Sequence, residues 1–167
     1  RVNFLDILQN FTIFEPVDGR VIKKIPRYQQ FRAVHKTIER LKVGNTPKDK
    51  SGVIWHTQGS GKSLTMVFLT VKIRRDPELK GYKLVFLTDR KQLDAQLTTT
   101  FSHAQNETVH HADSVESLKK LLASDSSDIV TAMVQKFQER TDNFEFPVLN
   151  ESHKIIVLAD EAHRTQY

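Results

Sequence analysis

The sequence predicts an α/β domain in which a mostly parallel β-sheet is covered by helices on both faces. Short apolar runs alternate along the chain with segments whose apolar residues recur at helical spacing. Two of these runs, over residues 53–56 and 154–159, lead into polar sequences of the kind found at the carboxyl ends of strands in open α/β sheets. These observations favour a sheet with a ligand site along one edge.

The composition fits one globular domain. The chain has 167 residues, 38% of them hydrophobic, and its 25 basic and 20 acidic residues give a net charge of +5, which permits nucleic-acid binding without requiring it. The absence of cysteine excludes disulfides and thiolate metal sites. Apolar runs stay well short of the roughly 20 residues of a membrane span, and no signal peptide is recognisable, so we expect a cytoplasmic protein without a membrane partner.

The N-terminal residues predict a helix, a hairpin and a second helix. Residues 2–11 have an amphipathic pattern, and residues 12–25 contain an Asp18-Gly19 turn that suits a β-hairpin. Pro26 fits the first position of the next helix, because its missing N–H needs no partner there. This helix ends before residues 44–47, and one of its faces holds Phe31, Val34, Ile38 and Leu41.

Strands and helices alternate over the rest of the chain. A short strand over residues 52–56 is expected to bury Trp55 in the core and to precede a helix whose packed face begins at Leu64. An Asp113-Ser114 cap starts a later helix, with Glu116 placed to complete a capping box. The other expected elements are strands over residues 83–88, 108–111, 128–133 and 154–159, and a helix over residues 90–100.

The loop after the strand at residues 52–56 has the pattern of a phosphate-binding loop. In Thr57-Gln58-Gly59-Ser60-Gly61-Lys62-Ser63, the glycines let backbone N–H groups turn toward phosphate oxygens, and Lys62 would reach the terminal phosphates. Ser63 offers a hydroxyl to Mg²⁺, and the helix that follows adds the positive end of its dipole. The full pattern has glycine where this chain has His56, but the residues around the phosphates are intact. The loop predicts binding of a nucleoside triphosphate with Mg²⁺.

A second nucleotide motif follows the apolar run at residues 154–159. Asp160 would hold Mg²⁺, usually through water, and Glu161 would orient and deprotonate the water that attacks the γ-phosphate. Two carboxylates after an apolar run are weak evidence alone, because a solvated strand end gives the same pattern. Together with the glycine loop they indicate hydrolysis of the triphosphate.

Five segments of the chain resemble the restriction subunit of type I restriction-modification enzymes, whose motor is a superfamily 2 translocase. The resemblance spans nearly the whole chain, and its spread makes it specific. It rests on an adenine-reading segment, a phosphate loop with His56 at its start, an F-x-x-D-R-x-x-L-x-x-Q motif, a Gln-Lys-Phe motif and a DEAH box. These lie at residues 25–34, 56–66, 86–96, 135–137 and 160–167.

The resemblance implies roles for further residues. Gln30 would hydrogen-bond the adenine edge of ATP and is favoured over Gln29 because Ala33 follows at the family's spacing; Arg27 would pack near the base. The expected contacts with the DNA backbone are Thr88, Asp89, Arg90 and Lys136. Asp89 also suits simple helix capping.

The resemblance also implies that the chain, as given, is a truncated RecA-like P-loop domain. We expect a lead-in segment over residues 1–25 and the first RecA-like domain over residues 26–167, cut after the DEAH box. In such motors the next strand lies between the phosphate-loop strand and the DEAH strand, and a second domain supplies an arginine finger, worth about 10³ to 10⁵ in rate in related systems. We therefore expect this fragment alone to bind ATP weakly and hardly to hydrolyse it.

The function implied is the ATP-binding half of a double-stranded DNA translocase that acts before endonuclease cleavage. The partners would be duplex DNA and the modification and specificity subunits of the restriction complex. Two alternatives stay open: another superfamily 2 DEAH-box helicase acting on RNA or forked DNA, and a module that binds nucleotide without hydrolysis. Intact Lys62 and Glu161 argue against the second alternative.

Overall fold

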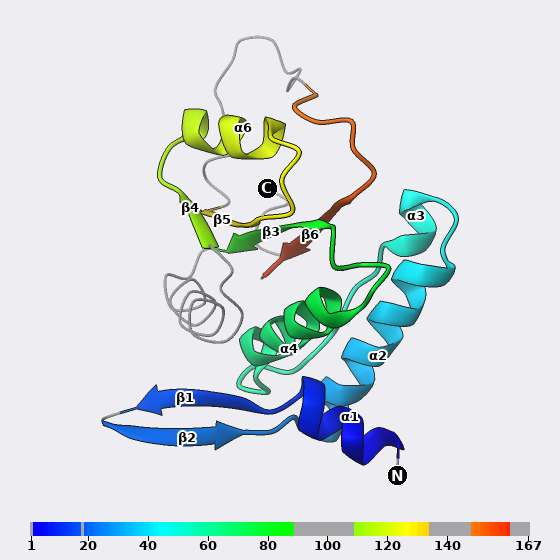
Figure 1. Ribbon diagram of the computed structural model, residues 1–167, viewed down its shortest axis with the longest axis vertical. Coiled ribbons are helices and arrows are strands. Elements are labelled where there is room, and N and C mark those ends of the chain that lie inside the picture. The colour runs from blue at the N-terminus through cyan, green and yellow to red at the C-terminus, as the bar shows by residue number, and fades with distance from the viewer. Residues whose placement is uncertain (1, 18, 89–108, 134–147, 161–167) are drawn as a thin grey trace. The chain divides into compact units, whose positions relative to one another are not determined.

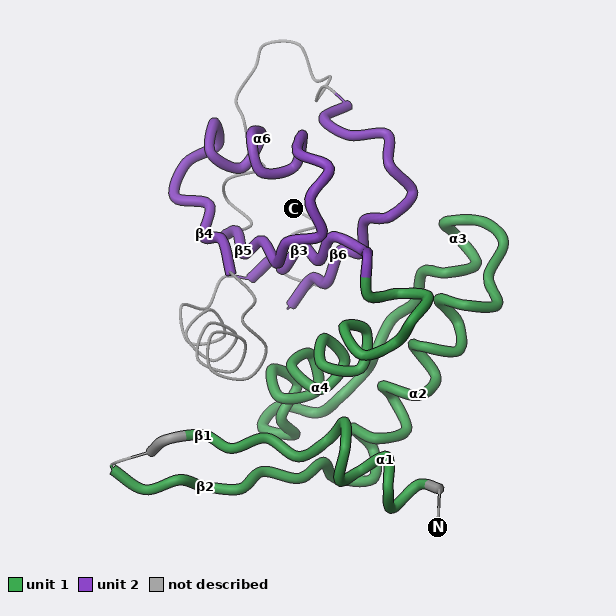
Figure 2. The backbone as a smooth tube through the Cα atoms, viewed as in Figure 1, with its two compact units in different colours: residues 1–80 green, residues 81–167 purple. Residues whose placement is uncertain are grey.

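A computed structural model describes residues 2–17, 19–88, 109–133 and 148–160 of the chain. It divides the chain into two compact units, Arg1–Lys80 and Gly81–Tyr167 (Figure 2). Among the described residues, no helix combines the length and the apolar composition that crossing a membrane requires.

The first unit opens with a helix and a hairpin, as the sequence predicts. Helix α1 (Val2–Asn10) is followed by strands β1 (Ile13–Val17) and β2 (Arg20–Lys24), which pair antiparallel (Figure 1). The turn contains Gly19, whose φ of +74° favours glycine. The lead-in therefore forms a helix and a hairpin of its own.

Helices α2 (Tyr28–Val43), α3 (Pro47–Lys50) and α4 (Lys62–Arg75) complete the first unit. The prediction that α2 begins at Pro26 is wrong by two residues, because the Gln30 side chain accepts the backbone N–H of Arg27 and makes Arg27 the N-cap. The ring centroid of Phe11 lies 4.9 Å from that of Phe31 and 5.6 Å from that of Phe68, so the residue directly after α1 packs against both long helices. The expected face of α2 is confirmed at Val34, Ile38 and Leu41, which are buried.

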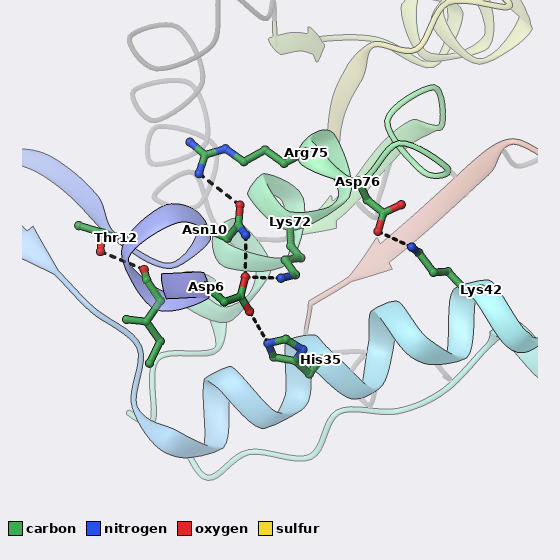
Figure 3. Close-up of polar contacts among 9 residues, drawn as sticks. Asp6, Asn10, Thr12, His35, Lys42, Lys72, Arg75 and Asp76 are labelled. Carbon is green, nitrogen blue, oxygen red and sulfur yellow. Dashed lines mark hydrogen bonds and ion pairs between the residues drawn. The ribbon is translucent and has the colours of Figure 1, made fainter. Parts of the chain in front are cut away.

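Polar contacts also fix the lead-in to the long helices (Figure 3). The Lys72 ammonium on α4 and the Asn10 amide both donate to the carboxylate of Asp6, and the other carboxylate oxygen lies 2.7 Å from the His35 ring on α2. Arg75 on α4 donates to the side chain of Asn10 over 3.4 Å. Helix α1 is thus held by charged groups as well as by Phe11.

The strand expected over residues 52–56 is absent from the structure. Residues 51–57 form no regular element, and the side chains of Val53 and Trp55 are 88% and 86% exposed, so the expectation that Trp55 packs in the core is also wrong. A strand inside a sheet needs a hydrogen-bonded neighbour, and no described strand pairs with this segment. The segment is nevertheless the one that leads into the glycine loop.

The second unit contains a parallel sheet of four described strands in the order β4-β5-β3-β6. These are β3 (Lys83–Thr88), β4 (Val109–Ala112), β5 (Ile129–Met133) and β6 (Ile155–Ala159). β3 pairs with β5 on one side and with β6 on the other, and its residues from Lys83 to Phe86 are buried. Each strand matches one predicted from the sequence, which confirms the α/β class with a parallel sheet.

Helix α6 (Val115–Ala123) packs on this sheet through Leu118, which contacts Ala112, Val130 and Ala132. Its N-cap is Ser114, whose hydroxyl accepts the N–H of Ser117 at 3.0 Å. The predicted capping box with Glu116 is wrong, because the third helical position belongs to Ser117.

Strand β6 is buried less completely than its apolar sequence predicts. Ile156 is buried, but Val157 is 56% exposed. Among the described strands, β6 has a neighbour on one side alone. It still ends where the sequence places it, directly before Asp160.

Candidate nucleotide-binding site

The glycine loop of the first unit has the backbone that a phosphate-binding loop requires. Gly59 and Gly61 have φ of +76° and +84°, in the left-handed region that residues other than glycine rarely adopt. Ser60 closes the turn by donating both its N–H and its hydroxyl to the carbonyl of Thr57, at 3.2 and 2.6 Å. The predicted loop is therefore formed although the strand before it is not.

Gly61 is the N-cap of α4, so Lys62 and Ser63 occupy the first two positions of the helix. The first N–H groups of a helix have no partner within it and carry the positive end of its dipole. The Lys62 ammonium donates to the carbonyl of His56 at 3.3 Å, slightly longer than the usual range for such a hydrogen bond. A ligand that offers stronger acceptors can replace that contact.

The Gln30 side chain connects α2 to this loop. Its oxygen accepts the backbone N–H of Arg27 at 2.8 Å, and its nitrogen donates to the carbonyl of Gly61 at 2.9 Å. The side chain is only 3% exposed. The sequence singles out Gln30 as a base-reading residue but gives no sign of its contact with Gly61.

Thr65 is a residue of the loop's surroundings that the sequence interpretation missed. Its hydroxyl donates to the same Gly61 carbonyl at 3.1 Å, in addition to the ordinary helical bond from its N–H at 3.0 Å. A threonine four residues after a glycine N-cap is a usable sequence signal, because its hydroxyl can bond back to the carbonyl one turn earlier.

The second unit brings Thr88 and Asp160 to the carboxyl ends of neighbouring parallel strands. The register pairs Leu87 of β3 with Ala159 of β6, and the Asp160 N–H donates to the carbonyl of Leu87 at 2.8 Å. Thr88 is 4% exposed and Asp160 is 6% exposed. A buried carboxylate at this edge lies where ligands of open α/β sheets bind.

Four of the predicted site residues lie outside the described residues. They are Asp89, Arg90, Lys136 and Glu161. The described site residues fall in both units, with the glycine loop in Arg1–Lys80 and Thr88 and Asp160 in Gly81–Tyr167.

The chain matches the SWI2/SNF2 ATPase family model over residues 29–167. This range contains both the glycine loop and Asp160. The chain therefore belongs to the SWI2/SNF2 ATPase family, and its domain uses ATP.

The similar proteins are endonuclease subunits of type I restriction enzymes. The chain is 38% identical to the HindI endonuclease subunit of Haemophilus influenzae over 172 aligned positions, which cover 99% of the chain and 16% of that protein. It is also 38% identical to the putative MjaIXP endonuclease subunit of Methanocaldococcus jannaschii, with the same shares covered. The SsaAORF53P endonuclease subunit of Staphylococcus saprophyticus is 30% identical over 96% of the chain and 17% of its own length. These relatives confirm the resemblance to the type I restriction subunit.

Proposed function

We propose that the chain is the ATP-binding half of a motor that hydrolyses ATP to translocate double-stranded DNA before endonuclease cleavage. It would act within the restriction subunit of a type I restriction enzyme. The observation that carries the proposal is the left-handed Gly59–Gly61 turn that opens α4 with Lys62 and Ser63. The relatives support the restriction subunit, although the chain spans only about a sixth of the length of the curated relatives it matches.

The loop geometry fits a triphosphate with Mg²⁺. Gly59 has open space where a side chain would be, so acceptor atoms can approach the backbone of the loop. Lys62 would bind the terminal phosphates, and Ser63 and Asp160 would hold Mg²⁺, with Glu161 orienting the attacking water and accepting its proton. Mg²⁺, when bound, neutralises charge on the phosphate oxygens.

The remaining assignments follow the resemblance. Arg27 and Gln30 would lie on the adenine side of the nucleotide, and Thr57 and Gly59–Ser63 would surround its phosphates. The candidate DNA contacts are Thr88, Asp89, Arg90 and Lys136. We propose a lead-in segment over residues 1–25 and a RecA-like domain over residues 26–167.

The proposed partners are duplex DNA and the modification and specificity subunits of the restriction complex, acting in the cytoplasm. The chain's net charge of +5 is compatible with binding nucleic acid. In the motor that we propose, ATP hydrolysis depends on duplex DNA.

ATPase activity of the full-length protein, assembled with its modification and specificity partners, tests this function. Rates would be compared with duplex DNA, single-stranded DNA and RNA. We expect stimulation by duplex DNA that carries an unmodified target, lost in Lys62→Ala. Stimulation by RNA, or turnover independent of the partners, would instead indicate another superfamily 2 helicase.

Glu161→Gln separates a motor from a module that only binds nucleotide. The variant keeps the size and hydrogen-bonding capacity of the side chain but removes its basicity. A motor would retain ATP binding and lose turnover, whereas a binding module would be unaffected in function. Unchanged function in this variant would therefore contradict the proposal.

A further inference from the structure

The Gln30 amide has both of its polar atoms committed to the backbone. Its oxygen needs a donor and finds the Arg27 N–H; its nitrogen needs an acceptor and finds the Gly61 carbonyl. The two partners together fix the orientation of the amide. The first contact joins residues within α2 and its cap, while the second joins residues 31 positions apart in the sequence.

The Gly61 carbonyl belongs to the peptide group that carries the Lys62 N–H. A trans peptide is planar, and its C=O and N–H point in opposite directions. The carbonyl accepts hydrogen bonds from the Gln30 amide and from the N–H and hydroxyl of Thr65. These donors therefore set the direction in which the Lys62 N–H points, and that N–H is among the groups available to a phosphate at the helix start.

The packing around Gly61 leaves Gln30 little freedom. A Cβ atom added to Gly61 would lie 2.7 Å from the Gln30 nitrogen. Because the side chain is 3% exposed, the surroundings that hold it are protein rather than water. The contact thus depends both on the absence of a side chain at Gly61 and on the amide at Gln30.

We propose that Gln30 is a positioning residue of the phosphate loop, which it holds in the binding conformation through the Gly61 carbonyl. This inference rests on the proposed function, and it differs from the base-reading role that the resemblance implies. A base-reading residue affects adenine nucleotides alone. A residue that orients the loop affects every ligand with a triphosphate, whatever its base.

The expected signature is a change in apparent affinity without a change in maximal rate. If the loop is less often in its binding conformation, the apparent dissociation constant rises in inverse proportion to the fraction of loops that remain in that conformation, while the rate of the saturated enzyme is unchanged. A purely structural role would lower the amount of active protein, which reduces kcat and leaves KM as it was.

The test measures DNA-stimulated ATP hydrolysis by the full-length protein, with inorganic tripolyphosphate as a base-free competitor. In Gln30→Met, KM for ATP and Ki for tripolyphosphate should both rise roughly fivefold, the factor that one hydrogen bond contributes, with kcat unchanged. Gln29→Met is the matched control, because Gln29 is an exposed neighbour on the same helix turn; its constants should equal those of the wild type.

Thr65→Val provides a second variant that does not touch the base side of the site. It removes the hydroxyl donated to Gly61 and keeps the side-chain shape, so both constants should rise together by a smaller factor. If Gln30→Met fails to fold, the result with Thr65→Val tests the inference instead. An unchanged KM for ATP together with an unchanged Ki for tripolyphosphate would overturn it.

Three results with Gln30→Met would also overturn it. These are a higher KM for ATP with an unchanged Ki for tripolyphosphate, a lower kcat with an unchanged KM, and no change in any constant. A wild-type protein that binds neither ATP nor tripolyphosphate would overturn the proposed function as well, so the two failures are distinguishable.

Discussion

Two segments of this chain, residues 52–56 and strand β3, are similarly apolar, but the first is exposed and irregular and the second is a buried strand. Both are short runs that the sequence predicts to be buried strands. In β3, Leu84, Val85 and Phe86 are at most 1% exposed, whereas Val53 and Trp55 are more than 80% exposed. Composition therefore does not separate them.

The difference lies in hydrogen-bonded neighbours. β3 is paired on both sides, with β5 and with β6, so its backbone groups are satisfied within the sheet. Residues 52–56 have no paired strand among the described residues. An apolar run becomes a strand where another strand adjoins it, and pairing rather than hydrophobicity decides the outcome here.

Hydrogen exchange gives the largest expected contrast between these segments. In the 167-residue chain, amides of β3 should exchange roughly a thousandfold or more slowly than those of residues 53–56, because opening a central strand costs a large part of the folding free energy. Equal rates in the two segments would contradict the comparison.

Substitution of one aromatic residue in each segment should show the next largest effect. Phe86→Ala removes a fully buried ring and should cost about 3–5 kcal/mol of unfolding free energy. Trp55→Ala removes an exposed ring and should change it by no more than about 0.5 kcal/mol. Urea unfolding of the 167-residue chain, followed by circular dichroism, measures both; similar losses would show that Trp55 is packed.

Helix α1 sharpens the comparison, because it is ordered despite the exposed side chains of Phe4 and Leu5. Polar side chains of other helices hold it, whereas β3 is held by neighbouring strands: Asp6 contacts Lys72 and His35. Asp6→Asn removes the charge but little volume, and should cost about 1.5–3 kcal/mol, the range for hydrogen bonds to charged groups. Its effect on thermal unfolding would be compared with that of Asn3→Ala, an exposed neighbour on the same helix.

The same contact predicts a weak acid dependence. Burial raises the pKa of the Asp6 carboxyl, but hydrogen bonds from Lys72 and Asn10 and the charges of Lys72 and His35 outweigh it, so the pKa lies below its ordinary value of 3.8. Asp6 therefore contributes stability above pH 3.8 that is lost as the pH falls through the folded value. As the pH falls below 3.8, the thermal midpoint of the wild type should decrease by more than that of Asp6→Asn, which lacks the carboxyl. Identical dependence of the midpoint on pH in the two proteins would contradict this prediction.

Local patterns predicted most of the fold. The helix and hairpin of the lead-in, the apolar face of α2 and the strands of the parallel sheet all follow from periodicity and turn residues, which act over short distances along the chain. The glycine loop and Asp160 followed from motifs whose chemistry depends on a few adjacent residues.

What the sequence could not give depends on contacts between distant residues. The missing strand at residues 52–56 depends on a pairing partner, and the start of α2 depends on which N–H the Gln30 oxygen accepts. The bond from Gln30 to Gly61 spans 31 positions and has no local pattern. The exposure of Val157 likewise has no signal in its apolar sequence; among the described strands, β6 is paired on one side alone.

The central proposal is that the glycine loop and Asp160 bind the same Mg²⁺-bound nucleotide. A double-mutant cycle on the affinity of full-length protein for ATP with Mg²⁺ tests it most directly, using Ser63→Ala, Asp160→Asn and the double variant. We predict strongly non-additive losses, because either change disturbs the same ion and the second then removes little more. Additive losses would show that the two residues act independently and would contradict the account.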